Sequence, residues 1–325
     1  MRFGHMLLTH SSSHDNYFDT VTELARASEE LGLDSLWFPD HFMFRNPRRP
    51  EQRFEIMECF TSMAAVAAIT SRVKLGAYVA GVPYRNPALL AKAFTTLDLI
   101  SHGRVVVGLG AAWHDLEFRA YGWEFEPARV RLDRLEEATE VVIRLMTERP
   151  VTFEGKYYRL DEAVNDPPPV QRPRPPIMIG GGGEQRTLRF VARYADYYNI
   201  FNATPDEVRH KYAVLAERCR EVGRDYGQIV KTCHATILIG RDEAEVAAKR
   251  ERHRSFLGNP LIGTPEQIVE GVRAYQAAGA EYFIFNLQDA HLVEPLRLMA
   301  ERVIPAFADV AAATTDPSVA DAPSG

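Results

Sequence analysis

The chain has 325 residues, of which 46% are hydrophobic and 25% are charged, and its net charge is -6 with a pI near 6.0. A chain of this length and hydrophobicity can bury a large core, while its net negative charge offers no overall attraction to nucleic acid or to anionic lipid. No apolar run approaches the length of a membrane span, so we expect neither a nucleic-acid partner nor a membrane partner.

The three cysteines, Cys59, Cys219 and Cys233, are far apart and form no Cys-x-x-Cys pair. This usage favours a reducing compartment over a disulfide framework or a zinc site. The N-terminal segment turns polar too early for a secretory leader. We therefore expect a cytoplasmic protein. The histidines are scattered and no metal-binding motif occurs, so the sequence predicts no metal site.

Short apolar runs alternate with longer amphipathic segments along the chain, a pattern typical of repeated βα units and a parallel sheet. Helices are predicted between the strands, over about residues 15–31, 55–70, 87–101, 128–147, 184–195, 205–222, 264–278 and 293–308. The eight predicted strands are Phe3–Leu8, Ser35–Phe38, Val73–Ala80, Arg104–Leu109, Ile177–Ile179, Tyr197–Phe201, Lys231–Ile239 and Tyr282–Asn286. Eight such units predict an α/β fold, a (β/α)8 TIM barrel whose catalytic side chains follow the C-terminal ends of its strands.

Two connections are longer than usual. Residues 150–176, before the fifth strand, contain a predicted hairpin at 151–160 and a proline-rich linker. A second insertion, residues 240–263, follows the seventh strand and is suited to cover the barrel mouth as a lid. We expect residues 1–310 to form a single domain and residues 311–325, which have almost no large apolar side chain, to be a disordered tail.

The fifth strand runs directly into four glycines and a glutamate, Gly180 to Glu184. Glycines leave backbone N–H groups accessible at a helix N-terminus, where the helix dipole favours an anion. The spacing fits neither a dinucleotide-binding fingerprint nor a P-loop. The segment therefore predicts a phosphate site of another kind, and a simple chain-reversing turn is the alternative.

The motifs that follow several strands together resemble one family. In order, they are residues 40–42, 75–87, 103–110, 180–184 and 193–196. Over residues 3–305 they resemble the luciferase-like flavin and deazaflavin oxidoreductases, which implies the same barrel fold. The segment 148–199 resembles the branch that uses coenzyme F420 more than the branch that uses FMN.

The resemblance implies where the cofactor binds. Its phosphate would lie at the glycine turn, and His41 would lie beside its reactive face, where an imidazole can donate to an anionic centre or move a proton. Asp40 would orient a ring or ribityl hydroxyl, unless it only caps a turn. A cis peptide bond is implied at Tyr78–Val79, behind the cofactor rings. The implied cofactor-binding residues are Asp40, His41, Tyr78, Val79, Ala80, Gly110, Ala111, Gly180, Gly181, Gly182, Gly183 and Glu184.

Residues after the fourth strand are expected to line the substrate pocket. Sugar-phosphate dehydrogenases of the deazaflavin group have a glutamate acid where this chain has Trp113, so the resemblance disfavours that substrate. The indole instead predicts an apolar wall for a planar or hydrophobic substrate, or ordinary packing beneath the loop. His114, Asp115 and Glu117 are candidates for the missing proton donor, or are solvated groups at a helix start. The catalytic candidates are therefore His41, Trp113 and His114.

We expect an enzyme that transfers a hydride between coenzyme F420 and an unidentified small organic substrate. The alternative within enzymes is an FMN-dependent monooxygenase that uses dioxygen and reduced flavin from a separate reductase. A flavin- or deazaflavin-binding protein without turnover is a third interpretation. The resemblance also implies a homodimer that pairs through helices beside the second and third strands. Residues 56–69 are apolar enough for such a surface, and ordinary packing of this helix on the barrel is the alternative.

Overall fold

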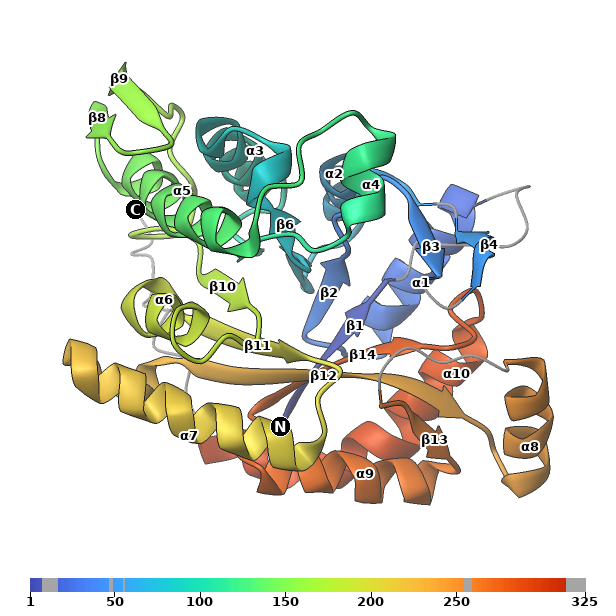
Figure 1. The fold of residues 1–325 in the computed structure, drawn as a ribbon. Helices are drawn as coiled ribbons and strands as arrows, with labels where there is room; N and C mark the ends of the chain where they lie inside the picture. Colours follow the sequence, from blue (N-terminus) through green and yellow to red (C-terminus); the bar gives the residue numbers. More distant parts are fainter. Residues whose placement is uncertain (8–16, 47–48, 55, 254–258, 314–325) are drawn as a thin grey trace, which may run out of the picture.

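The computed structural model describes residues 1–7, 17–46, 49–54, 56–253 and 259–313. Eight parallel strands form a closed barrel with helices packed around it (Figure 1). The chain order of the strands is also their order around the barrel, and the last strand pairs with the first. The strands are β1 (Arg2–Met6), β2 (Ser35–Phe38), β5 (Lys74–Ala77), β7 (Val105–Gly110), β10 (Ile177–Gly180), β11 (Tyr197–Phe201), β12 (Val230–Ile239) and β14 (Tyr282–Leu287). The predicted TIM barrel is confirmed.

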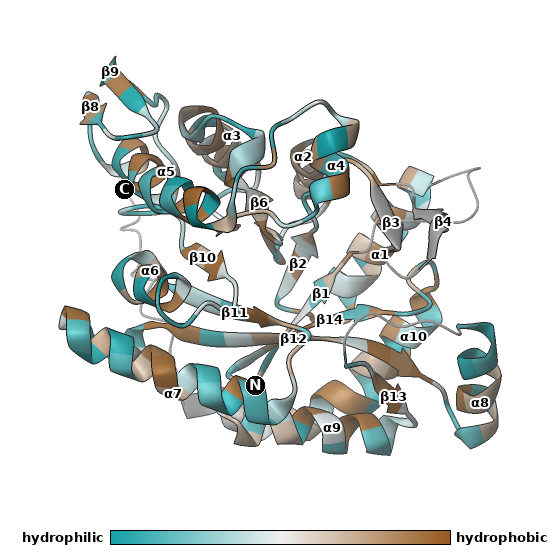
Figure 2. Ribbon diagram, in the orientation of Figure 1, coloured by the Kyte–Doolittle hydropathy of each residue, from teal (hydrophilic) through white to brown (hydrophobic). Residues whose placement is uncertain are grey.

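The barrel strands are apolar almost throughout because both of their faces are covered, by the barrel interior and by the helices. In Figure 2, β10 and parts of β12 are brown, whereas teal residues recur along α5, α7 and α8. Trp37 fills much of the interior and is fully buried. Two glycines make room for it, because a Cβ on Gly76 would lie 2.3 Å from the indole and a Cβ on Gly4 would lie 2.6 Å from it. The interior is therefore a packed core and not a channel.

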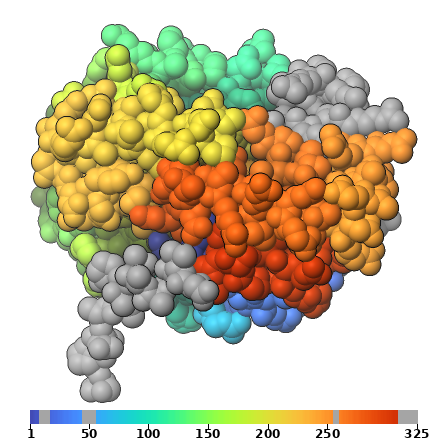
Figure 3. All heavy atoms as spheres, turned by 90° about the horizontal axis from the view of Figure 1, so that it is seen from below, coloured from blue at the N-terminus to red at the C-terminus, as the bar shows by residue number. Residues whose placement is uncertain are grey.

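The helices begin and end at residues that suit their termini. Asn86 accepts a hydrogen bond from the backbone N–H of Ala88, and Thr204 forms a capping box with Glu207. The main helices are α1 (Tyr17–Glu30), α2 (Cys59–Ile69), α3 (Pro87–Ile100), α5 (Ala128–Thr147), α6 (Thr187–Tyr194), α7 (Pro205–Val222), α9 (Pro265–Ala277) and α10 (Val293–Leu298). Seen from below, the yellow α7 and the orange α9 cover one side of the barrel (Figure 3).

Three predicted helix boundaries are wrong. Helix α2 starts four residues late because Glu58 caps it, accepting from the Thr61 N–H at 2.7 Å. Helix α6 starts three residues late, because residues 184–186 form a turn after the glycines. The last helix ends as a regular α-helix at Leu298 and continues as the π-helix η3 (Met299–Val303) and the 3-10 helix η4 (Ile304–Ala313).

Both insertions contain regular structure. The first holds the predicted hairpin, formed by β8 (Val151–Glu154) and β9 (Arg159–Ala163). The second holds α8 (Glu243–Arg252) and β13 (Leu261–Gly263), but residues 254–258 lie outside the described residues and the lid stays a prediction. Elements that the sequence did not reveal are β3 (Phe44–Asn46), β4 (Arg49–Phe54), β6 (Ala80–Gly81), η1 (Val82–Tyr84), α4 (Asp115–Ala120) and η2 (Tyr226–Gln228).

The C-terminal boundary of the domain is only partly described. Residues 311–313 belong to η4, and residues 314–325 of the predicted tail lie outside the described residues. The division into one domain and a tail therefore stays a prediction. Among the helices described, none is long and apolar enough to cross a membrane.

Candidate active site

The predicted site residues follow the C-terminal ends of neighbouring strands and so gather at one end of the barrel. Asp40 and His41 follow β2, the Tyr78–Val79 bond follows β5, and the glycine turn follows β10. These three segments contact one another. The Asp40 carboxylate accepts a hydrogen bond from the Gly81 N–H at 2.9 Å, and the Val79 side chain lies against Gly180. The sequence pattern therefore identified one continuous surface.

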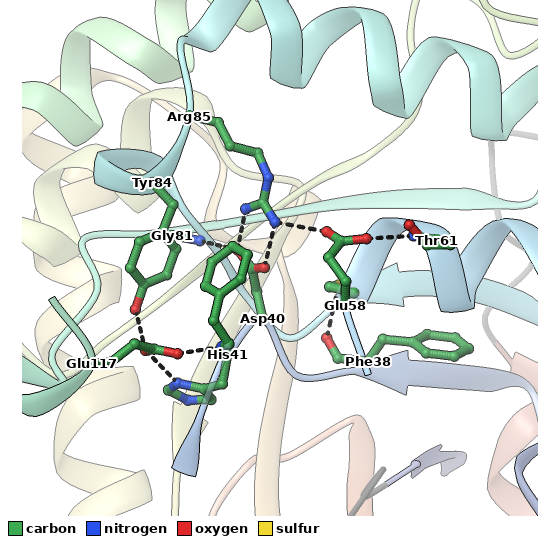
Figure 4. A network of polar contacts seen from close by, with 11 residues as sticks. Phe38, Asp40, His41, Glu58, Thr61, Gly81, Tyr84, Arg85 and Glu117 are labelled. Atoms are coloured by element: carbon green, nitrogen blue, oxygen red, sulfur yellow. Dashed lines mark hydrogen bonds and ion pairs between the residues drawn. The ribbon is translucent and has the colours of Figure 1, made fainter. Parts of the chain in front are cut away.

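Asp40 holds two rim segments together. Its side chain is buried, and its carboxylate accepts from the Gly81 N–H and from both terminal nitrogens of Arg85, at 2.7 and 2.9 Å (Figure 4). Arg85 also donates to Glu58 at 2.8 Å. Such a forked ion pair fixes the orientation of both partners. Both oxygens of Asp40 thus have protein donors, and its contact with a cofactor hydroxyl stays a prediction.

His41 is oriented by Glu117, which comes from α4. The imidazole Nδ1 lies 3.0 Å from Oε2 of Glu117, and Tyr84 donates to the same oxygen at 2.7 Å (Figure 4). Glu117 is fully buried, so it is not a solvated group at a helix start, which was one of its two interpretations. Burial acts to raise the pKa of Glu117, but hydrogen bonds from His41, Tyr84 and Phe42 outweigh it and lower the pKa.

Trp113 and His114 lie beside His41. The Trp113 ring is 5.8 Å from the His41 ring, edge to face, and the side chain of Trp113 is 56% exposed. Such exposure of an indole favours the apolar wall over packing beneath the loop. His114 is buried, and burial together with the nearby His41 lowers its pKa. A neutral His114 can still take part in a proton transfer, so its catalytic role stays a prediction.

The third strand is interrupted where the resemblance implied a cis bond. The Tyr78–Val79 peptide bond is cis, as expected, and it separates β5 from β6. Val79 packs against glycines of two neighbouring strands, Gly110 and Gly180. A Cβ placed on Gly110 would lie 2.5 Å from the Val79 side chain, and a Cβ placed on Gly180 would lie 3.5 Å from it. Ala80 pairs with Leu109, next to Gly110 and Ala111. The glycines make room for the interruption of the strand.

The glycine turn is open to solvent and faces cationic side chains of α7. Gly181, Gly182 and Gly183 are exposed, and Gly181 has a φ of +132°, which favours glycine. Glu184 binds Lys211 at 2.6 Å and His210 at 2.9 Å, and the hydrogen bonds from both side chains lower the pKa of Glu184. The turn therefore combines exposed glycines with a lysine, and glycine turns and lysines are features that bind a phosphate.

Sequence reasoning missed several residues of this rim. Lys211 and Arg218 lie seven residues apart on one face of α7, a helical spacing that was visible in the sequence, and Arg218 donates to the Glu184 carbonyl at 3.1 Å. His234 and Phe201 stack with ring centroids 4.4 Å apart beside Tyr78. Phe201 is 52% exposed, so it adds a second aromatic wall that no motif indicated.

Residues 1–260 match the sequence profile of the luciferase-like monooxygenases. The chain belongs to this family. It is 33% identical over 230 residues to the F420-dependent glucose-6-phosphate dehydrogenase of Kineococcus radiotolerans, a match that covers 69% of this chain and 65% of that protein. The chain therefore spans just under two thirds of the length of this relative.

Two solved structures share the fold over nearly the whole chain. An F420-dependent secondary alcohol dehydrogenase in complex with an F420-acetone adduct is similar with a TM-score of 0.80 and 23% identity, covering 94% of this chain and 98% of that one. The monooxygenase RslO1 from Streptomyces bottropensis is similar with a TM-score of 0.80 and 22% identity, covering 94% of this chain and 100% of that one. At these identities the likeness supports the fold alone.

Proposed function

We propose that the protein is an oxidoreductase that binds coenzyme F420 across the barrel mouth and transfers a hydride between the cofactor and an organic substrate. The observation that carries the proposal is the arrangement of three features along one rim. The cation-lined glycine turn lies at one end, the Val79 interruption lies in the middle, and His41 lies beyond Asp40. The F420 dependence named for the Kineococcus relative supports the choice of cofactor.

The residues present fit such a cofactor. Gly180 to Gly183 would hold its phosphate, with Lys211 supplying positive charge, and Glu184 would keep Lys211 in place. Tyr78, Val79 and Ala80, with Gly110 and Ala111 beside them, would support the rings from the barrel side. When bound, the deazaflavin would supply a ring carbon that accepts or donates a hydride.

The protein's own chemistry would be orientation and proton transfer. His41 would exchange the proton that accompanies the hydride, and Trp113 and Phe201 would hold an apolar part of the substrate and exclude water. His114 is a second candidate for the proton exchange. We propose a substrate other than a sugar phosphate, because the resemblance aligns Trp113 with the glutamate acid of those dehydrogenases.

Two alternatives have specific support. An FMN-dependent monooxygenase, supplied with reduced flavin by a separate reductase, is favoured by the name of the family. A flavin- or deazaflavin-binding protein without turnover is favoured by the indole at position 113 where related dehydrogenases have an acid.

We also propose a homodimer in a reducing cytoplasm. Leu89 is 57% exposed and Ile100 is 39% exposed on α3, which packs beside the apolar α2. Exposed apolar side chains on a surface helix are typical of a subunit interface. The three cysteines are buried and unpaired, as expected in a reducing compartment.

One experiment separates these functions. Native mass spectrometry of the wild-type protein with coenzyme F420 and with FMN should give a complex with F420. His41→Ala should keep the affinity for F420 and lose about 100-fold or more of turnover, because general acid–base catalysis contributes about 10²–10⁴-fold. His102→Asn, on the loop after α3, is the matched control. Preferential FMN binding with oxygen consumption would favour the monooxygenase, and cofactor binding without turnover would favour the binding protein.

A further inference from the structure

Glu117 collects four hydrogen bonds inside the protein. Its Oε1 accepts from the backbone N–H groups of Phe42 and Met43, the second at 3.0 Å. Its Oε2 accepts from Tyr84 at 2.7 Å and lies 3.0 Å from Nδ1 of His41. The side chain of Glu117 has no exposed surface. The two backbone donors fix one oxygen, so the other oxygen has a set position relative to His41.

The donors decide the charge of Glu117. A buried carboxyl group without partners would hold its proton, but these donors lower the pKa of Glu117 below its usual value. At neutral pH it is therefore a carboxylate, and a carboxylate can only accept hydrogen bonds. The imidazole nitrogen that faces it must donate.

We propose that Glu117 is a positioning residue that keeps a proton on Nδ1 of His41, so that His41 exchanges its catalytic proton at Nε2. A carboxylate fixes the tautomer of the histidine in Ser-His-Asp triads by the same physical principle. The exchange with substrate rests on the proposed function, whereas the tautomer is a property of the protein alone. Other described groups near His41 are Asp40, Trp113, whose ring lies 5.8 Å away, and His114, whose ring lies 5.9 Å away.

Replacing Glu117 by glutamine gives a sharp test. In Glu117→Gln, the amide oxygen is expected to face the N–H groups of Phe42 and Met43, because the opposite orientation would set donors against donors. The amide NH2 would then face Nδ1 of His41 and donate to it. The neutral imidazole would carry its proton on Nε2 in place of Nδ1.

The tautomer is read directly by ¹⁵N NMR of protein with labelled histidine, without cofactor, with the His41 signals assigned by their loss in His41→Ala. We expect Nδ1–H in the wild type and Nε2–H in Glu117→Gln. Tyr84→Phe should keep Nδ1–H, since Glu117 remains. Nε2–H in the wild type, or no change in Glu117→Gln, would overturn the proposal. The wild-type spectrum keeps the test decisive if the variant does not fold.

Turnover gives a second readout. In Glu117→Gln, kcat should fall about 10-fold or more with a smaller change in KM, because Nε2 of the neutral imidazole would then carry a proton and could not accept one. Asp98→Asn is the matched control, because Asp98 is also a buried acidic side chain, and it accepts from the backbone N–H of Val170 at 2.7 Å. An unchanged kcat in Glu117→Gln would count against the proposal. If the wild-type protein has its proton on Nδ1 of His41 but shows no turnover, the proposed function is refuted and the positioning role of Glu117 still stands.

Discussion

Replacing Gly108 by alanine should displace the interrupted third strand. A Cβ on Gly108 would lie 1.9 Å from the carbonyl oxygen of Ala77, whereas a carbon and a carbonyl oxygen in contact lie about 3.3 Å apart. One of the two strands must therefore move by about 1.4 Å, and the atom in the way is backbone, which cannot rotate aside. Overpacking costs about 1–3 kcal/mol and occasionally more, so we expect a loss of about 3 kcal/mol.

Gly180→Ala is the control for this substitution. Its Cβ would meet Val79 at 3.5 Å, an ordinary contact, so the free energy of unfolding should change by less than about 1 kcal/mol. Urea unfolding, followed by tryptophan fluorescence, measures both variants. Gly108→Ala should also bind coenzyme F420 more weakly, because its Cβ would displace Ala77 and Val79, and we propose that Val79 supports the rings. Equal unfolding free energies for the two variants would refute the reasoning.

Three further predictions concern the phosphate site, the subunit interface and acid stability. Lys211→Gln should weaken F420 binding about tenfold in calorimetric titrations, because a hydrogen bond to a charged group contributes about 1.5–3 kcal/mol. Arg220→Gln, on the same helix, is the control and should leave the affinity unchanged. Equal F420 affinities of the two variants would argue against a phosphate site at the glycine turn. Leu89→Asp should give a monomer in sedimentation velocity and Leu292→Asp, at an exposed position before α10, should not; an unchanged dimer would exclude this face. Burial lowers the pKa of His5 from 6.5 to about 3, so His5 is protonated at a lower pH in the folded state than in the unfolded chain. The free energy of unfolding therefore decreases as the pH falls from about 6.5 towards 3. His5→Asn should reduce the slope of the unfolding free energy by about 1.4 kcal/mol per pH unit between pH 6 and 4, measured by urea unfolding, and an unchanged slope would contradict this assignment.

The barrel was predictable because its signals are local. Each strand is a short apolar run, and several helices begin at an Asn-Pro or Thr-Pro pair that both caps the helix and starts it. The start of α6 was not predictable in this way. The predicted helix begins at Glu184, but the side chain of Glu184 contacts Lys211 of α7, and that contact joins residues 27 positions apart.

The site was predictable only where a residue follows its own strand. His41 and the glycines satisfy that rule, and the cis bond came from the family resemblance alone. Glu117 shows the limit of local reasoning. Its sequence context indicates an exposed helix start, but the backbone of residues 42 and 43, which is 74 or more positions away, covers it. Burial of this kind depends on tertiary packing, which no local pattern encodes.

Arg85 has a consequence for the evolution of this family. Its planar guanidinium spans Asp40 from the β2 loop and Glu58 at the start of α2, and a lysine ammonium cannot reproduce that two-sided fork. Loss of Arg85 would leave two neighbouring carboxylates at the rim without this counterion. Homologous sequences should therefore keep Asp40, Glu58 and Arg85 or exchange them together. Such covariation would identify the homologues that share this ion-pair network.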